Sequence, residues 1–267
     1  MLRWSINLFR VFGIQLALHA SFVLFLAYEG WEGWREGGWE GLAASMVLIV
    51  LFFACVVMHE LGHSLTARRF GVKVPRILLM PIGGMAEFDH IPQQPRAEFL
   101  ITAAGPLVNF VIVALLYAIF GVPKGWPSLN TEYPDNWVGL AQILLSWNAT
   151  MGLFNLLPVF PMDGGRIFRA GLATRMSYLK ATYWASLVGK VLALTGGLVA
   201  AFYFNNLLLG ALFIFIFFAG EAEYKAVLRR ERETAYYAEM ARRLAEIPAV
   251  DPESTPPRLT DYYHGPN

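Results

Sequence analysis

The chain has a single cysteine, Cys55, among its 267 residues. An intrachain disulfide and a cluster of thiolate metal ligands are therefore excluded, and Cys55 is expected to be a small apolar residue within a helix. Charged side chains are also scarce, at 15%, and a formal net charge of +1 argues against a nucleic-acid partner. By contrast, 56% of the residues are hydrophobic and the mean hydropathy is +0.46. This composition predicts a polytopic membrane protein rather than a soluble domain.

Six apolar segments follow one another along the chain, at residues 12–28, 42–65, 99–120, 138–157, 183–204 and 207–220. Most are long enough to cross a hydrocarbon core, for which about 20 residues is typical. The last two segments are divided at Asn205 and Asn206, where one kinked helix is the alternative. We predict an all-α polytopic membrane protein with six transmembrane helices.

The lysines and arginines are divided unevenly between the two sides that six crossings create. Of the 21, only Arg35 and Lys124 fall on one side, and Lys190 lies inside the fifth apolar segment. All the others precede the first segment, follow the sixth, or lie between the second and third or the fourth and fifth. Because basic residues are retained on the cytoplasmic side, the pattern supports six crossings and predicts that both termini are cytoplasmic.

Three polar residues stand at the end of the second apolar segment, in the sequence His59-Glu60-Leu61-Gly62-His63. Residues four apart share one face of a helix, so both imidazoles can bind one metal ion while Glu60 lies beside it as a general base. The alternative is a chance match, with the histidines satisfied by backbone groups or by each other. Ionisable side chains at membrane depth are costly and mark functional sites, which favours the metal site.

A catalytic zinc ion usually takes three protein ligands, so a third must come from elsewhere in the chain. Asp163 is the candidate, because it follows the fourth segment, which runs in the same direction as the second and ends at the same membrane depth. Pro158 and Pro161 end that helix, and the two glycines after Asp163 allow a close turn. A carboxylate that caps the next helix is the alternative.

The sequence resembles the site-2 protease family of intramembrane zinc metalloproteases over residues 12–169. The resemblance rests on the histidine motif and on Asn155-Leu156-Leu157-Pro158-Val159-Phe160-Pro161-Met162-Asp163-Gly164-Gly165, with further matches at Gly83-Gly84, at Gly105-Pro106 with Asn109, and at His19-Ala20-Ser21-Phe22. It implies one Zn²⁺ bound by His59, His63 and Asp163, with Glu60 as the catalytic base. It also implies that Asn155 positions the substrate or the developing oxyanion. A contact between helices is the alternative for Asn155 and the stronger prediction for Asn148.

Residues 76–88 are apolar but too short to cross a membrane, and Pro81 with Gly83 and Gly84 would break a helix. We expect a short re-entrant or interfacial loop that resembles a β-hairpin. Its edge could pair with an extended substrate, since a transmembrane helix must unwind before its amide bonds can be cut. A loop that only packs over neighbouring helices is the alternative.

Two parts of the chain differ in composition. Residues 1–220 are predicted to form the transmembrane metalloprotease domain, and residues 221–267 a cytoplasmic helical extension with a flexible, proline-rich tail.

We therefore expect an intramembrane zinc endopeptidase in the lipid bilayer of a prokaryotic cell membrane. It would hydrolyse a single-pass transmembrane protein substrate near the cytoplasmic side, in regulated intramembrane proteolysis, as the resemblance implies. The alternative is a membrane transporter or a metal-binding scaffold that uses the same ligands without hydrolysis. Glu60 favours the protease, because a transporter has no evident need for a base beside a three-ligand zinc ion.

Overall fold

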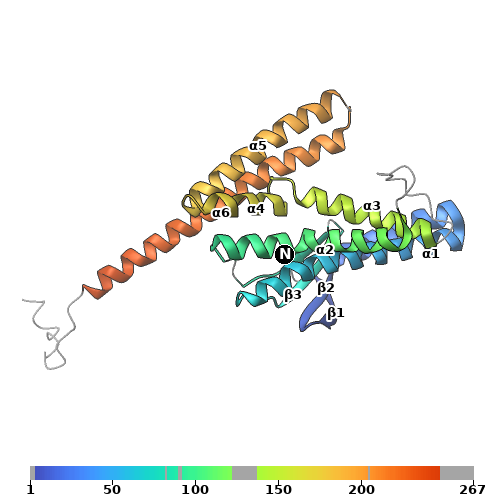
Figure 1. Ribbon diagram of the computed structural model, residues 1–267, viewed down its shortest axis with the longest axis horizontal. Helices are drawn as coiled ribbons and strands as arrows, with labels where there is room; N and C mark the ends of the chain where they lie inside the picture. The colour runs from blue at the N-terminus through green and yellow to red at the C-terminus, as the bar shows by residue number, and fades with distance from the viewer. Residues whose placement is uncertain (1–3, 82, 90–91, 122–136, 204, 247–267) are drawn as a thin grey trace, which may run out of the picture. The chain divides into compact units, whose positions relative to one another are not determined.

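The computed structural model describes residues 4–81, 83–89, 92–121, 137–203 and 205–246 (Figure 1). The chain divides into two units, Met1–Tyr224 and Lys225–Asn267. Ile82, the segment that contains Lys124, and the proline-rich tail lie outside the described residues. The domain boundary expected after residue 220 stays a prediction.

The N-terminal residues form two strands, the second of which lies where the sequence predicts the start of a helix. β1 (Ser5–Val11) and β2 (Ile14–His19) pair antiparallel around Phe12 and Gly13, whose φ angles are 50° and 80°. Two positive φ angles are typical of the two-residue turns that match the twist of a hairpin. The fold is mostly helical, as predicted, but the prediction of a helix from residue 12 is wrong, because β2 occupies residues 14–19 and the helix begins at Ala20. Periodicity does not distinguish a strand from a helix in an apolar run this short.

α1 (Ala20–Arg69) is a helical hairpin with two arms. Its backbone leaves the helical range at Gly37 and Gly38, where the chain bends back. The arms approach so closely that a Cβ atom on Gly41 would lie 2.2 Å from the carbonyl oxygen of Gly33. Glycine is required there because any side chain would separate the two arms. The first two predicted helices are thus the arms of α1, and the histidine motif lies on the second.

The chain then returns to the sheet. β3 (Arg76–Met80) pairs parallel with β2, β4 (Gly83–Ala86) pairs antiparallel with β3, and the strand order is β1-β2-β3-β4. The hairpin expected within residues 76–88 is confirmed, as half of a larger sheet. Buried residues of the sheet and of the second arm of α1 form one apolar core, which includes Ile14, Leu16, Ile77, Leu79, Phe53 and Val56. The sheet therefore packs against the arm that carries the histidines.

The remaining helices are α2 (Pro95–Phe120), α3 (Trp137–Asn155), α4 (Asp163–Ala173), α5 (Tyr178–Phe202) and α6 (Leu207–Ala245). α2 packs against both α1 and α3 (Figure 1). The break at Asn205 and Asn206 is confirmed: Asn205 has a φ of 47°, and the side chain of Asn206 accepts a hydrogen bond from the Leu209 amide at 3.0 Å. The short helix α4 was not predicted.

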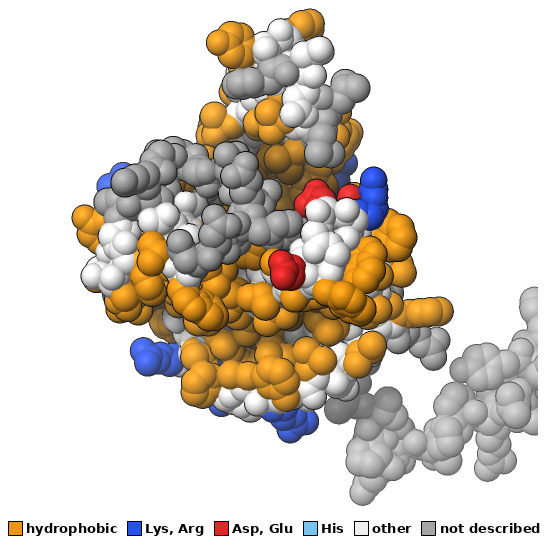
Figure 2. Space-filling model, turned by 90° about the vertical axis from the view of Figure 1, so that its right-hand side faces the viewer, with side chains coloured by type: hydrophobic (Ala, Val, Ile, Leu, Met, Phe, Trp, Pro, Cys, Tyr) orange, Lys and Arg blue, Asp and Glu red, His pale blue; other side chains and the backbone are white. Residues whose placement is uncertain are grey.

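Three of the described helices, α1, α2 and α5, are long and apolar enough to cross a membrane. Their outward side chains are large and hydrophobic, as Val50, Leu107 and Leu194 illustrate with exposed fractions of 65%, 62% and 60%. Figure 2 shows a face on which hydrophobic side chains cover most of the described surface and charged ones are few. Lipid is the environment that suits such a surface, so the chain is a multi-pass membrane protein.

A buried ion pair ties α4 to α2. The Arg169 guanidinium donates to the Glu98 carboxylate, with Nε 2.8 Å from Oε1, and both side chains are 1% exposed. Arg169 also donates to Glu223 at 2.6 Å, and Tyr178 donates to Glu98 at 3.2 Å. Removing either partner of such a pair would leave an uncompensated buried charge, which costs about 3–5 kcal/mol. The pair therefore holds α4 in a fixed position against α2.

Candidate metal centre

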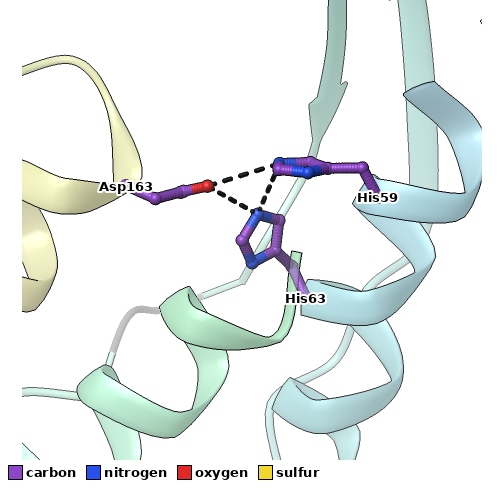
Figure 3. Close-up of side chains that lie close together, drawn as sticks. All are labelled: His59, His63 and Asp163. Atoms are coloured by element: carbon purple, nitrogen blue, oxygen red, sulfur yellow. Dashed lines mark hydrogen bonds and ion pairs between the residues drawn. The ribbon is translucent and has the colours of Figure 1, made fainter. Parts of the chain in front are cut away.

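Three ligand-type side chains converge between α1 and α4 (Figure 3). His59 and His63 lie one turn apart on α1 and are 5% and 7% exposed. Their Nε2 atoms are 3.1 Å apart, and Oδ2 of Asp163 lies 3.3 Å from the first and 3.2 Å from the second. The histidine spacing and Asp163 thus come together as the sequence predicts, although Asp163 arrives on the first turn of α4.

The outer nitrogen of His63 faces the backbone of α2. Its Nδ1 lies 2.8 Å from the carbonyl oxygen of Ile101, which only accepts hydrogen bonds, so Nδ1 carries the proton. Nε2 is then an unprotonated nitrogen that points toward Asp163. A Cβ atom on Gly105 would lie 2.2 Å from this Nε2 and 2.8 Å from Cε1 of His59. The absence of a side chain at Gly105 therefore makes room for both rings.

The outer nitrogen of His59 is held by a chain of buried amides. The Asn148 amide donates to the Leu144 carbonyl at 2.8 Å, so its oxygen faces Asn109 and accepts from the Asn109 amide nitrogen at 2.9 Å. The Asn109 oxygen is thereby turned to Nδ1 of His59, at 2.6 Å. Since a carbonyl oxygen only accepts, Nδ1 carries the proton and Nε2 of His59 faces the centre unprotonated.

Two imidazole nitrogens and one carboxylate oxygen thus face a common point without a proton between them. Oδ2 of Asp163 is buried and has no hydrogen-bond partner among the described residues. Ligands of a tetrahedral zinc ion, at 2.0–2.1 Å from the metal, are about 3.3 Å apart. The donor set and its spacing fit a zinc ion.

Glu60 lies between the second arm of α1 and the edge strand β4. Its Oε2 accepts a hydrogen bond from the Ala86 backbone amide at 3.2 Å. A Cβ atom on Gly84 would lie 2.6 Å from Cγ of Glu60, so the strand reaches this carboxylate only because residue 84 is glycine. The candidate base therefore follows the ligand His59 directly along α1 and contacts the sheet edge.

The face of α2 that meets the histidines is made of residues four apart: Ile101, Gly105 and Asn109. Each contacts or makes room for His59 or His63. The sequence analysis names Gly105 and Asn109 only as matches to the family and predicts no contact of either residue with the histidines. The common spacing of four residues was the signal that could have identified this face. The spacing alone does not show that this face contacts the histidines, because a single sequence does not reveal which helix α2 packs against.

Asp163 is placed by the two glycines that follow it. A Cβ atom on Gly164 would lie 2.2 Å from the carbonyl oxygen of Leu157, and one on Gly165 would lie 2.7 Å from the carbonyl carbon of Val159. The first turn of α4 therefore packs directly on the preceding loop. Asp163 does belong to this helix terminus, but its side chain points to the two histidines (Figure 3).

The other polar residues of the sequence analysis have local partners. The Asn155 amide donates to the Met151 carbonyl of its own helix at 3.0 Å, so its catalytic role stays a prediction. Asn148 accepts a hydrogen bond from Asn109 of α2 and donates one to Sγ of Cys55 of α1 at 3.2 Å. It therefore joins α3 to both helices, which confirms its interhelical role. His19 accepts from the Ser21 amide at 3.2 Å and caps the first arm of α1.

Comparisons with known proteins identify relatives of this chain. The family model described as peptidase family M50 matches residues 47–129 and 122–196. The chain is 39% identical over 232 residues to the zinc metalloprotease MJ0392 of Methanocaldococcus jannaschii, a match that covers 85% of this chain and 62% of that protein. A solved structure, the site-2 protease from Methanocaldococcus jannaschii, matches with a TM-score of 0.56 and 39% identity over 83% of this chain and 95% of that one.

Gly105→Ala should prevent metal binding, because the new methyl group would occupy the space of His63 Nε2. We expect the zinc content to fall from about one ion per chain to near zero, and the unfolding temperature to fall as well, because the methyl group overpacks a tight contact between two helices. Elemental analysis of the purified protein measures this. Gly171→Ala is the matched control, because a Cβ atom on this helical glycine would meet no atom of another described segment within 4 Å. Full zinc occupancy in Gly105→Ala would contradict the site geometry.

Asn109→Leu should weaken zinc binding by about 10–100-fold, because it removes the acceptor that orients His59. Asn109→Asp keeps the acceptor oxygen for His59 but loses the donor to Asn148, so it should weaken binding less than Asn109→Leu does. Competition with a zinc chelator gives both affinities. Thr182→Val, which removes an equally buried hydroxyl that bonds to its own helix, controls for a general loss of packing. Equal losses in the leucine and aspartate variants would show that the acceptor is not what matters.

Proposed function

This chain belongs to peptidase family M50, and we propose that it is an intramembrane zinc endopeptidase of the site-2 protease type. The observation that carries the proposal is the three-ligand centre of His59, His63 and Asp163, with the carboxylate residue Glu60 directly after the first ligand on α1. The name of the archaeal relative, a zinc metalloprotease, supports it. Because the chain spans only 62% of the length of that relative, the activity is inferred for this chain rather than transferred.

In this proposal His59, His63 and Asp163 hold one Zn²⁺ and Glu60 moves the protons. Bound zinc lowers the pKa of a coordinated water to about 7 and polarises the carbonyl that the water attacks. Glu60 accepts the proton from the attacking water and delivers it to the leaving amine. The buried amides behind His59 keep its Nε2 turned to the ion throughout.

Asn155 is proposed to bind the developing oxyanion or to position the substrate. It stands at the last residue of α3, immediately before the loop that leads to Asp163. Its amide donates to the Met151 carbonyl in the absence of substrate. To act on an oxyanion it would have to exchange that partner, which an amide at a helix end can do because the last carbonyls of a helix also bond to water.

The substrate class follows from the location of the centre. A single-pass transmembrane protein that enters among these helices keeps its amides hydrogen-bonded until a segment unwinds, and an exposed strand edge can take up the unwound backbone. β4 is the edge strand next to Glu60. We therefore propose that substrates add to β4 as a strand and are cut near their cytoplasmic ends, in regulated intramembrane proteolysis.

The finer topology is part of the same proposal. We propose six crossings with both termini in the cytoplasm, with residues 1–220 as the protease domain and residues 221–267 as a cytoplasmic extension. The charge bias of the lysines and arginines supports this arrangement. The relatives come from archaea and bacteria, which supports a prokaryotic cell membrane.

The decisive experiment compares the native chain with Glu60→Gln, each co-expressed with a panel of single-pass membrane proteins. Glu60→Gln should abolish cleavage but keep about one zinc ion per chain, because the ligands remain while the proton acceptor is lost. Asp163→Ala is the companion variant and should lose both zinc and cleavage. Undiminished cleavage by Glu60→Gln would refute the mechanism. A native chain that binds zinc and cuts no member of the panel would favour the transporter or scaffold.

Topology is tested by reporter fusions. A reporter after Asn267 and one inserted near Lys180 should both report the cytoplasm, and one near Ser128 should report the exterior, because basic residues are concentrated on the first side. The opposite labelling would place the cut at the other side of the membrane.

A further inference from the structure

The backbone groups of β4 alternate between the sheet and its free edge. The register pairs Ile77 with Ala86 and Leu78 with Met85, and the Glu87 amide donates to the Arg76 carbonyl at 2.9 Å. In an antiparallel ladder the pair next to a hydrogen-bonded pair points its amides outward. The amides of Gly84 and Ala86 therefore face the free edge, whereas the amide of Met85 faces β3.

One of these two outward amides is already engaged. The Ala86 amide donates to Oε2 of Glu60 at 3.2 Å, and Gly84, which has no side chain, lets the strand lie directly on the stem of that carboxylate. An amide has a single proton to donate. Ala86 therefore has no proton to spare for an added strand while Glu60 holds it.

We propose that Glu60 and an incoming substrate strand compete for the Ala86 amide, so that strand pairing releases the catalytic base. This inference rests on the proposed function, since it takes Glu60 as the base and β4 as the substrate edge. Before pairing, the carboxylate is held on the sheet edge. When a substrate backbone carbonyl accepts from Ala86, Glu60 loses that partner and turns to the metal centre.

The competition links two events that a protease in lipid needs to occur together. A strand that pairs with β4 has been unwound, so its amide bonds can be attacked. A transmembrane helix that is still wound has no free carbonyl to offer to Ala86 and leaves Glu60 where it is. The base is thus released by the extended backbone and not by a particular side chain. In this way the enzyme would distinguish an unwound substrate from one that is still helical.

The same alternation shows where a proline can test the edge. Met85→Pro would remove a donor that faces β3 and would disturb the hairpin itself, and Ile82 lies outside the described residues. Ala86→Pro removes the contested donor and leaves the ladder to β3 intact, as proline is tolerated on edge strands with its nitrogen outward. It is therefore the informative variant.

The test measures strand binding in two inactive, zinc-loaded variants. Glu60→Gln keeps an oxygen that can accept from Ala86, whereas Glu60→Met has the same length and no acceptor. The probe is a fluorescent peptide of alternating valine and threonine flanked by lysines, and its affinity is read by anisotropy in detergent micelles. One competing hydrogen bond predicts that Glu60→Met binds this peptide about two- to tenfold more tightly than Glu60→Gln.

Two comparisons separate the possible failures. In an Ala86→Pro background the change from glutamine to methionine at residue 60 should no longer tighten binding, because the contested donor is gone. A peptide with every second amide N-methylated should bind weakly to all variants. Equal affinities of Glu60→Gln and Glu60→Met for the parent peptide would overturn the competition.

Binding that ignores N-methylation, or no binding in any variant, would overturn strand addition and the competition with it. Neither outcome touches the zinc mechanism, which is judged by cleavage in the native chain and its loss in Glu60→Gln. Amide exchange gives a second reading without any peptide: the Ala86 amide should exchange faster in Glu60→Met than in Glu60→Gln.

Discussion

Two imidazole rings buried among apolar helices need a partner for each of their ring nitrogens, and the centre of the molecule is arranged around that requirement. The carbonyl oxygens of Ile101 and Asn109 satisfy the two outer nitrogens, which leaves both inner nitrogens for a metal ion. Those partners reach the rings only because the two helices approach at Gly62 and Gly105. A Cβ atom on Gly62 would lie 2.7 Å from the Ala104 carbonyl oxygen, so glycine is needed on both sides of the contact.

α2 connects the two halves of the metal centre. One of its faces orients the histidines of α1, and Glu98, near its start, binds Arg169 of α4 and so fixes the helix that begins with Asp163. A buried ion pair is weak evidence for stability, because desolvation offsets much of the attraction. Its value here is geometric: a carboxylate on a separate helix must arrive within about 2 Å of a metal ion, and the fork of Arg169 constrains α4 in more than one direction.

The sequence was most informative where chemistry is local and least where it depends on packing. The spacing of His59 and His63, the end of α3 before Pro158 and the break at Asn206 are visible in a few adjacent residues. β2 was mistaken for the start of a helix, because short apolar runs suit either structure. The contacts of Gly105 and Asn109 were missed, since they depend on which face of α2 meets α1. The bond between Ala86 and Glu60 joins backbone to side chain across 26 residues, and no residue type signals it.

A sheet in an otherwise helical membrane protein has a physical use that more helices would not supply. In hydrocarbon, each unpaired backbone group costs several kcal/mol, so a substrate helix resists unwinding unless its amides and carbonyls find new partners. An edge strand offers such partners in a row, independent of side chains. β4 is short, packs against the arm of α1 that carries the histidines, and has glycine where a side chain would push it away from Glu60. The surface suited to stabilise an unwound backbone is thus in contact with Glu60, the proposed catalytic base.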